Sequence, residues 1–198
     1  YDAGNYAEAA TYFAQLEGVA SKEHKKAATL GLLRCYFLLK EYDKTIAAAT
    51  DVIATYGGDS DMVAEARYNR LKAYLATNQI EESLPDTREL AKDTRSEWGA
   101  EAKYLMCHYY LYKKDYAKAE SEVFDYIEKG TGHQHWLAKA FLVLADVYVA
   151  QGNYFEAKQY LLSLQENYDA SQDAEVAMGI TTRLETIKLY ENETVSNN

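Results

Sequence analysis

The stretch YVAQGNYFEA at residues 148–157 combines a tyrosine, a Gln-Gly-Asn turn, a second tyrosine and, three residues later, an alanine. Similar stretches are YFLLKEYDKT at 36–45, YLATNQIEES at 74–83 and YLYKKDYAKA at 110–119. Aligned on Tyr6, Tyr42, Ile80, Tyr116 and Tyr154, successive copies are 36 or 38 residues apart. A fixed period in this range is typical of repeat architectures, so we take the stretch to mark one unit of a repeat.

The residues around this stretch predict two antiparallel helices joined by a tight turn. Apolar residues in 138–151 follow helical spacing, and Gly152 tolerates the left-handed backbone that closes a helix. A second helix is expected from Tyr154, with the small Ala157 lying against Ala145 of the first helix. One such hairpin buries its apolar stripe only by stacking on its neighbours.

These residues resemble the tetratricopeptide repeat family, whose pattern has a small residue, tyrosine, glycine, tyrosine and alanine at places 8, 11, 15, 17 and 20. Residues 138–164 match it with Ala145, Tyr148, Gly152, Tyr154 and Ala157, and the opening fragment matches Gly4, Tyr6, Ala9 and Phe13. The third repeat departs from the pattern with Asn78, Ile80 and Ser83, and the family's usual proline after the second helix is absent. The repeats are also longer than usual, which resembles tetratricopeptide proteins of the bacterial cell envelope.

The resemblance implies an all-α fold, an α-solenoid of about five helix-turn-helix repeats wound as a right-handed superhelix with a C-terminal capping helix. We expect a single repeat domain over 1–198, with repeats at 1–20 (partial), 22–57, 60–95, 96–132 and 133–169 and the capping helix at 171–191. Because the chain opens at YDAGNY, where a first helix should already have ended, we expect it to be a fragment of a larger protein.

Composition narrows the class of function. The formal net charge is −10, which disfavours nucleic acid and anionic lipid as partners. No apolar run approaches the ~20 residues that a membrane-spanning helix needs, so we expect no membrane insertion by this segment. The two cysteines, Cys35 and Cys107, form no CxxC motif. The residues leave the compartment open, and the envelope resemblance favours the bacterial periplasm or cell envelope over the cytoplasm.

The family resemblance also implies which residues line a concave groove on the first helices. Carried onto this sequence, its groove places give Arg34, Phe37, Tyr68, Lys72, Tyr104, His108, Tyr112 and Asp146 as the partner-binding residues. The aromatic residues would anchor a peptide and the basic ones would pair with its acidic groups. The alternative is that these tyrosines only pack between neighbouring first helices.

No pattern of catalytic or cofactor-binding residues was found, so we expect a protein that is not an enzyme and needs no cofactor or metal. The segment GHQHW at 132–136 offers His133 and His135, a spacing that can chelate a metal if a third ligand joins them. We favour an exposed linker loop, with a metal-dependent enzyme as the alternative.

The sequence therefore predicts a scaffold that binds a protein or peptide in its concave groove. The alternative is a structural module of a cell-envelope assembly that self-associates as a homo-oligomer, because terminal hairpins would expose stripe residues such as Phe13 and Leu16.

Overall fold

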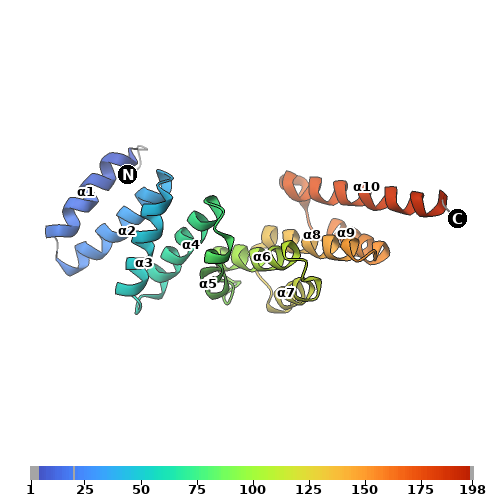
Figure 1. Ribbon diagram of the computed structural model, residues 1–198, viewed down its shortest axis with the longest axis horizontal. Coiled ribbons are helices and arrows are strands. Elements are labelled where there is room, and N and C mark those ends of the chain that lie inside the picture. The colour runs from blue at the N-terminus through green and yellow to red at the C-terminus, as the bar shows by residue number, and fades with distance from the viewer. Residues whose placement is uncertain (1–4, 20, 197–198) are drawn as a thin grey trace. The chain divides into compact units, whose positions relative to one another are not determined.

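The computed structural model describes residues 5–19 and 21–196, and this part of the chain is helical and contains no strand (Figure 1). The first five helices are α1 (Tyr6–Val19), α2 (Lys22–Leu38), α3 (Tyr42–Thr55), α4 (Ser60–Ala76) and α5 (Ile80–Leu90). They are followed by α6 (Glu97–Tyr112), α7 (Tyr116–Lys129), α8 (Gln134–Ala150), α9 (Tyr154–Asn167), the 3-10 helix η1 (Ala170–Gln172) and α10 (Ala174–Ser196). Gly4, at the start of the predicted partial repeat, lies outside the described residues.

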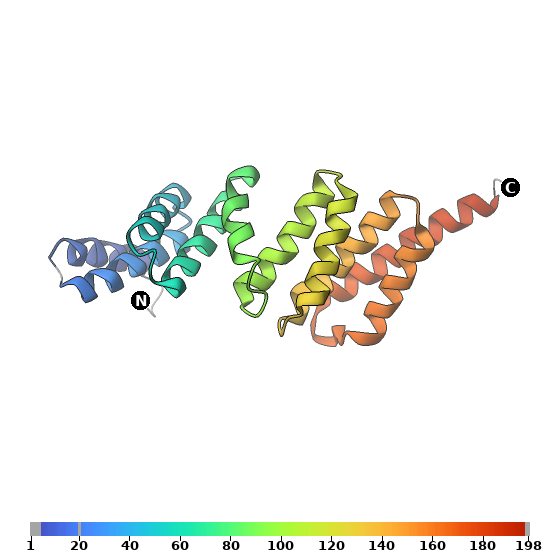
Figure 2. The same cartoon turned by 90° about the horizontal axis from the view of Figure 1, so that it is seen from below.

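The contacts divide the chain into two compact units, which we call unit 1 (up to Leu90) and unit 2 (from Ala91). Within each unit every helix packs on the next one in the chain, and successive helices alternate in direction (Figures 1 and 2). First helices of neighbouring hairpins also pack together: α2 on α4 in unit 1, and α6 on α8 and α8 on α10 in unit 2. The all-α prediction is confirmed, and the assignment of the hairpins to one repeat domain stays a prediction.

Four hairpin turns share one backbone geometry. The residues at the tips of these turns have positive φ angles: Lys40 (59°), Asn78 (59°), Lys114 (57°) and Gly152 (78°). In each turn the N–H of the next residue donates to the carbonyl oxygen of the tyrosine five residues earlier, at 2.8–2.9 Å. Those tyrosines are Tyr36, Tyr74, Tyr110 and Tyr148. This bond closes each first helix in a Schellman motif, which explains the constant spacing from tyrosine to turn.

The buried positions recur in the same register. Four alanines occupy the third place of the repeat pattern, counted from residue 138 in the repeat of α8 and α9. They are Ala28, Ala66, Ala102 and Ala140, and all are fully buried. All four second helices bury the same three places: Thr45, Ala49 and Val52; Ser83, Thr87 and Leu90; Ala119, Val123 and Tyr126; Ala157, Leu161 and Leu164. In addition, α5 buries Leu84 and Asp86. As predicted, Ala145 and Ala157 lie fully buried in one core. A small residue at this crossing lets the two helices approach closely.

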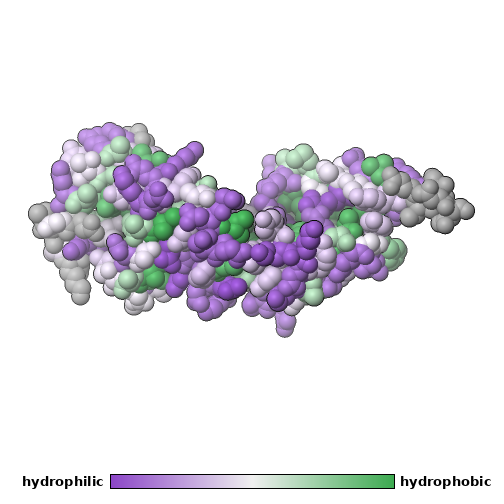
Figure 3. Space-filling view, in the orientation of Figure 1, coloured by the Kyte–Doolittle hydropathy of each residue, from purple (hydrophilic) through white to green (hydrophobic). Residues whose placement is uncertain are grey.

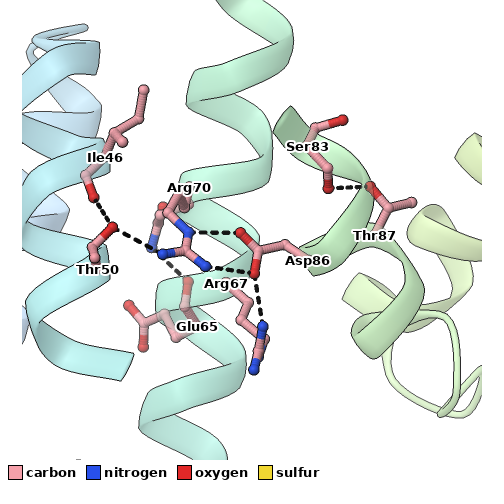
Figure 4. A network of polar contacts seen from close by, with 9 residues as sticks. Ile46, Thr50, Glu65, Arg67, Arg70, Ser83, Asp86 and Thr87 are labelled. Carbon is pink, nitrogen blue, oxygen red and sulfur yellow. Dashed lines mark hydrogen bonds and ion pairs between the residues drawn. The ribbon is translucent and has the colours of Figure 1, made fainter. Parts of the chain in front are cut away.

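The hairpin of α4 and α5 has a polar interior (Figure 4). Asp86 of α5 is almost fully buried and accepts hydrogen bonds from Arg67 Nη1 (2.8 Å) and from Arg70 Nε and Nη2 (2.7 and 2.9 Å) of α4. Arg70 Nη1 also donates to Thr50 Oγ1 of α3, at 2.8 Å. This network therefore joins three consecutive helices of unit 1.

The last helix starts later and runs further than the predicted capping helix. It follows η1, and Asp173 Oδ1 accepts the N–H of Val176 at 3.2 Å, so Asp173 caps the helix. Tyr190, which lies 36 residues after Tyr154, falls inside α10 and stacks on the Tyr154 ring at 5.0 Å between centroids. The chain does not turn where the repeat pattern would place the next hairpin turn.

Candidate partner-binding surfaces

The eight predicted groove residues divide equally between the two units. Arg34 and Phe37 lie on α2, and Tyr68 and Lys72 on α4, in unit 1. Tyr104, His108 and Tyr112 lie on α6 and Asp146 on α8, in unit 2. Each unit therefore carries four of them on first helices that pack side by side.

In unit 1 the predicted basic side chains already interact with groups of the protein itself. Arg34 of α2 forms a two-pronged ion pair with Glu65 of α4, with its Nη2 2.7 Å from Oε2. Lys72 Nζ lies 5.7 Å from the centroid of the Tyr68 ring on the same helix, and Phe37 is half-buried. An acidic partner would have to compete with Glu65 for Arg34.

In unit 2, Tyr104 connects α6 to α8. Its ring stacks on Trp136 at 5.6 Å between centroids, and Lys139 Nζ lies 4.7 Å from its centroid. Burial raises the pKa of Tyr104, which keeps the phenol neutral. Lys139 Nζ in turn bonds Glu175 of α10 at 2.7 Å. These contacts support the packing interpretation for Tyr104.

His108 and Tyr112 lie further along α6 and are exposed. The His108 ring is tilted against Tyr104 at 6.0 Å between centroids. Partial desolvation lowers the pKa of His108, so at neutral pH its imidazole is uncharged and can both donate and accept a hydrogen bond. The side chain of Tyr112 is 64% exposed. Of the four predicted residues in unit 2, these two have the most surface to offer a partner.

Asp146 is held by a residue that the sequence analysis missed. Arg183 of α10 donates from Nε and Nη2 to the two carboxylate oxygens of Asp146, at 2.8 and 2.6 Å. Next to this pair, Gly179 approaches α8 so closely that a Cβ atom there would lie 2.6 Å from Leu142 Cδ1. The sequence offered one signal for this pair: Asp146 and Arg183 are 37 residues apart, about one repeat, which places them on neighbouring first helices.

The two histidines of GHQHW contact different parts of unit 2. His133 Nε2 lies 3.1 Å from the carbonyl oxygen of Arg95, and His135 Nδ1 lies 2.6 Å from Asp173 Oδ2. Throughout residues 5–19 and 21–196, no three or more His, Cys, Asp or Glu side chains are grouped as metal ligands would be. Both histidines are half-buried and residues 134–136 belong to α8, so the prediction that GHQHW is an exposed linker loop was wrong.

No family model matches the chain, and no curated protein matches it. None of the described helices has both the length and the apolar character needed to cross a membrane.

Proposed function

We propose that the chain is a non-enzymatic scaffold, an α-solenoid of tetratricopeptide-like repeats that binds a protein or peptide along its first helices. The sequential packing of hairpins, the contacts between neighbouring first helices and the recurring buried places support this architecture. A face of adjacent first helices suits an extended or helical peptide, which it can contact over several turns.

The observation that carries the proposal is a pair of exposed apolar side chains in the same register. Leu38 ends α2 and Tyr112 ends α6, each two residues before the left-handed lysine of its turn. They are 45% and 64% exposed. Packing of the hairpins does not require a large apolar side chain at this place, because Ala76 and Ala150 occupy it in the other two hairpins. Partly exposed apolar residues of this kind serve as anchors for a partner.

The outer face of α10 supports its role as a capping helix. On α8, the register places 138, 142, 145 and 149 hold Ala, Leu, Ala and Val, and the first three of them are buried. Thirty-six residues later the same places on α10 hold Ala174, Met178, Thr181 and Glu185, all exposed. Polar residues at two of these places suit a capping helix, whose outer face is polar.

The test uses substitutions that leave the core untouched. Partners captured from a lysate by the wild-type chain are identified by mass spectrometry, and their affinities for Leu38→Ala/Tyr112→Ala are then measured by titration. We expect a loss of at least about tenfold, whereas Phe155→Ala, a similarly exposed aromatic on α9, should bind as the wild type does. Equal affinities of all three proteins would refute the assignment of the binding face.

The second candidate is a self-associating structural module. Of the two residues that the sequence predicted to be exposed, Leu16 of α1 is 40% exposed, whereas Phe13 is half-buried against Gly31 of α2. Tyr12, 62% exposed and four residues before Leu16, shares the face of Leu16. Contiguous exposed apolar side chains favour association. Light scattering across a wide concentration range tests it, and a strictly monomeric mass at every concentration would eliminate this candidate.

A further inference from the structure

Unit 2 contains a cavity of about 270 Å³, and none of the predicted groove residues lines it. It opens between the first turns of α8 and the last turns of α9. Its lining carries no charge: Leu137, Ala138, Phe141 and Leu164 are apolar, and Gln134, Ser163, Asn167 and Tyr168 are polar. This volume lies just below the ~300–1,000 Å³ typical of small-molecule sites and suits one large apolar side chain.

An exposed apolar stripe on α7 leads toward this cavity. Phe124 and Ile127 are 40% and 38% exposed and three residues apart, so they share one face of α7. The Phe124 ring contacts the Tyr160 ring of α9 edge-on, at 6.3 Å between centroids. Tyr160 is one helical turn before Ser163, at the cavity rim. Both α7 and α9 pack on α8, and we call the apolar strip that runs from Ile127 and Phe124 past Tyr160 to the cavity the α7–α9 groove.

The charged residues beside this groove are acidic. Glu128 lies one turn after Phe124 on α7, and Glu156 lies one turn before Tyr160 on α9, and both are exposed. The nearest lysines pair elsewhere, Lys129 with Asp125 at 2.8 Å and Lys158 with Glu191 at 2.9 Å. Hydrophobic residues on the face drawn in Figure 3 occur as separate patches in a mostly hydrophilic surface. Glu128 and Glu156 are thus exposed acidic side chains beside the apolar strip.

We propose that the groove between α7 and α9 binds a basic amphipathic helix, with one large apolar side chain of that helix inserted into the cavity. A helix laid into an apolar groove is anchored by side chains three or four residues apart, which matches the line from Ile127 and Phe124 to the cavity. Lysine or arginine residues flanking the anchors would face Glu128 and Glu156. A second copy of this chain is a poorer occupant, because it would bring the same acidic side chains to the same place.

The experiment uses a fluorescein-labelled helical peptide of leucine and lysine, titrated with the full chain at physiological ionic strength and followed by anisotropy. In Ser163→Trp, a bulky side chain at an exposed rim position fills the cavity without changing the core. We expect this variant to bind the peptide at least about tenfold more weakly than the wild type. Gln165→Trp adds the same side chain at an exposed position on the opposite side of α9 and should bind as the wild type does.

A second pair of measurements tests the charge of the partner. Glu128→Lys/Glu156→Lys should weaken binding of the leucine–lysine peptide, and a leucine–glutamate peptide should not bind the wild type. The Leu38→Ala/Tyr112→Ala variant should bind the basic peptide normally, which separates this site from the proposed function. Far-UV circular dichroism verifies that every variant keeps its helical content.

Two results would overturn the proposal. One is equal affinity of Ser163→Trp and the wild type for the basic peptide, which would place binding outside the cavity. The other is a concentration-dependent dimer that Ser163→Trp dissociates, because a second copy would then occupy the groove.

Discussion

The hairpins α4/α5 and α8/α9 share one backbone geometry, but the interior of α4/α5 is polar and that of α8/α9 is apolar. Each turns through a left-handed residue, Asn78 or Gly152, and each buries the same three places of its second helix. In α8/α9 those places are Ala157, Leu161 and Leu164, whereas in α4/α5 they are Ser83, Thr87 and Leu90.

Turn geometry and spacing therefore set the shape of a hairpin, and its interior can be polar if every group is paired. Both oxygens of Asp86 accept hydrogen bonds from arginine, and the Thr87 hydroxyl donates to the carbonyl oxygen of Ser83 at 2.8 Å. In α6/α7, Lys103 and Glu122 stand 36 residues after Arg67 and Asp86 and also form an ion pair. These two places thus hold an ion pair in two successive hairpins.

The largest effect is expected from Asp86→Ala. The substitution leaves Arg67 and Arg70 partly buried without their carboxylate, and breaking a buried ion pair in this way costs about 3–5 kcal/mol. Urea unfolding followed by far-UV circular dichroism measures the change. The triple variant Arg67→Met/Arg70→Leu/Asp86→Leu, which makes this interior resemble that of α8/α9, should recover most of the stability. If the triple variant were as unstable as Asp86→Ala, the network would be required for more than charge pairing.

A smaller loss is expected from overpacking the apolar hairpin. In Ala157→Leu the larger side chain meets the fully buried Ala145 region of α8, and overpacking of this kind costs typically about 1–3 kcal/mol. Both tryptophans, Trp98 and Trp136, lie in unit 2, so urea unfolding followed by tryptophan fluorescence reports on this hairpin's unit. The exposed Ala150→Leu serves as the control and should change stability little.

Much of the hairpin architecture could be predicted from sequence, because it depends on local spacing. The distance from tyrosine to turn is a property of one helix end, and the small residue at Ala157 is required by one helix crossing. The Asp86 network was missed because Arg67, Arg70 and Asp86 contribute no sequence motif; their proximity arises only when the helices pack. The sequence did predict that the hairpin pattern changes at the last helix, because Lys188 stands where Gly152 stands one repeat earlier, and α10 continues through that position.

The predicted groove residues show more clearly what the sequence does not reveal. The repeat register predicted the helix on which each residue lies, but contacts with the neighbouring helix decide whether its side chain is available to a partner. Arg34 pairs with Glu65, and Asp146 with Arg183, so these charges serve contacts between first helices. Tyr112 has no such neighbour contact to bury it and remains 64% exposed. Whether any of the eight residues binds a partner stays a prediction.

The hydrogen bonds that Asp173 makes with Tyr168 and His135 should make the stability of unit 2 depend on pH. Partial burial opposes the effect, but hydrogen bonds from Tyr168 and His135 lower the pKa of Asp173 from 3.8 to about 2. A pKa that is lower in the folded state gives stabilisation that is fully present above about pH 4 and is lost as the pH falls through about 2. The stability difference between the wild type and Asp173→Asn, measured by tryptophan fluorescence in urea, should therefore shrink over this window. A difference that stays constant with pH would contradict it.

The smallest effect concerns the turns themselves, where Lys114 has the left-handed backbone that Gly152 adopts without strain. The left-handed backbone costs a residue with a Cβ atom about 1–2 kcal/mol of stability. Glycine avoids this cost, but it raises the conformational entropy of the unfolded chain, which offsets part of the stabilisation. Lys114→Gly should therefore stabilise unit 2 by about 0.5–1 kcal/mol, and Gly152→Ala should destabilise it by a similar amount. Lys113→Gly is the matched control, because Lys113 has an ordinary right-handed backbone (φ −74°), where glycine only adds unfolded-state entropy and lowers stability. Urea unfolding would contradict this prediction if Lys114→Gly lowered the free energy of unfolding as much as Lys113→Gly does. The left-handed backbone of the four turns would then not explain why the repeat pattern has glycine at this place.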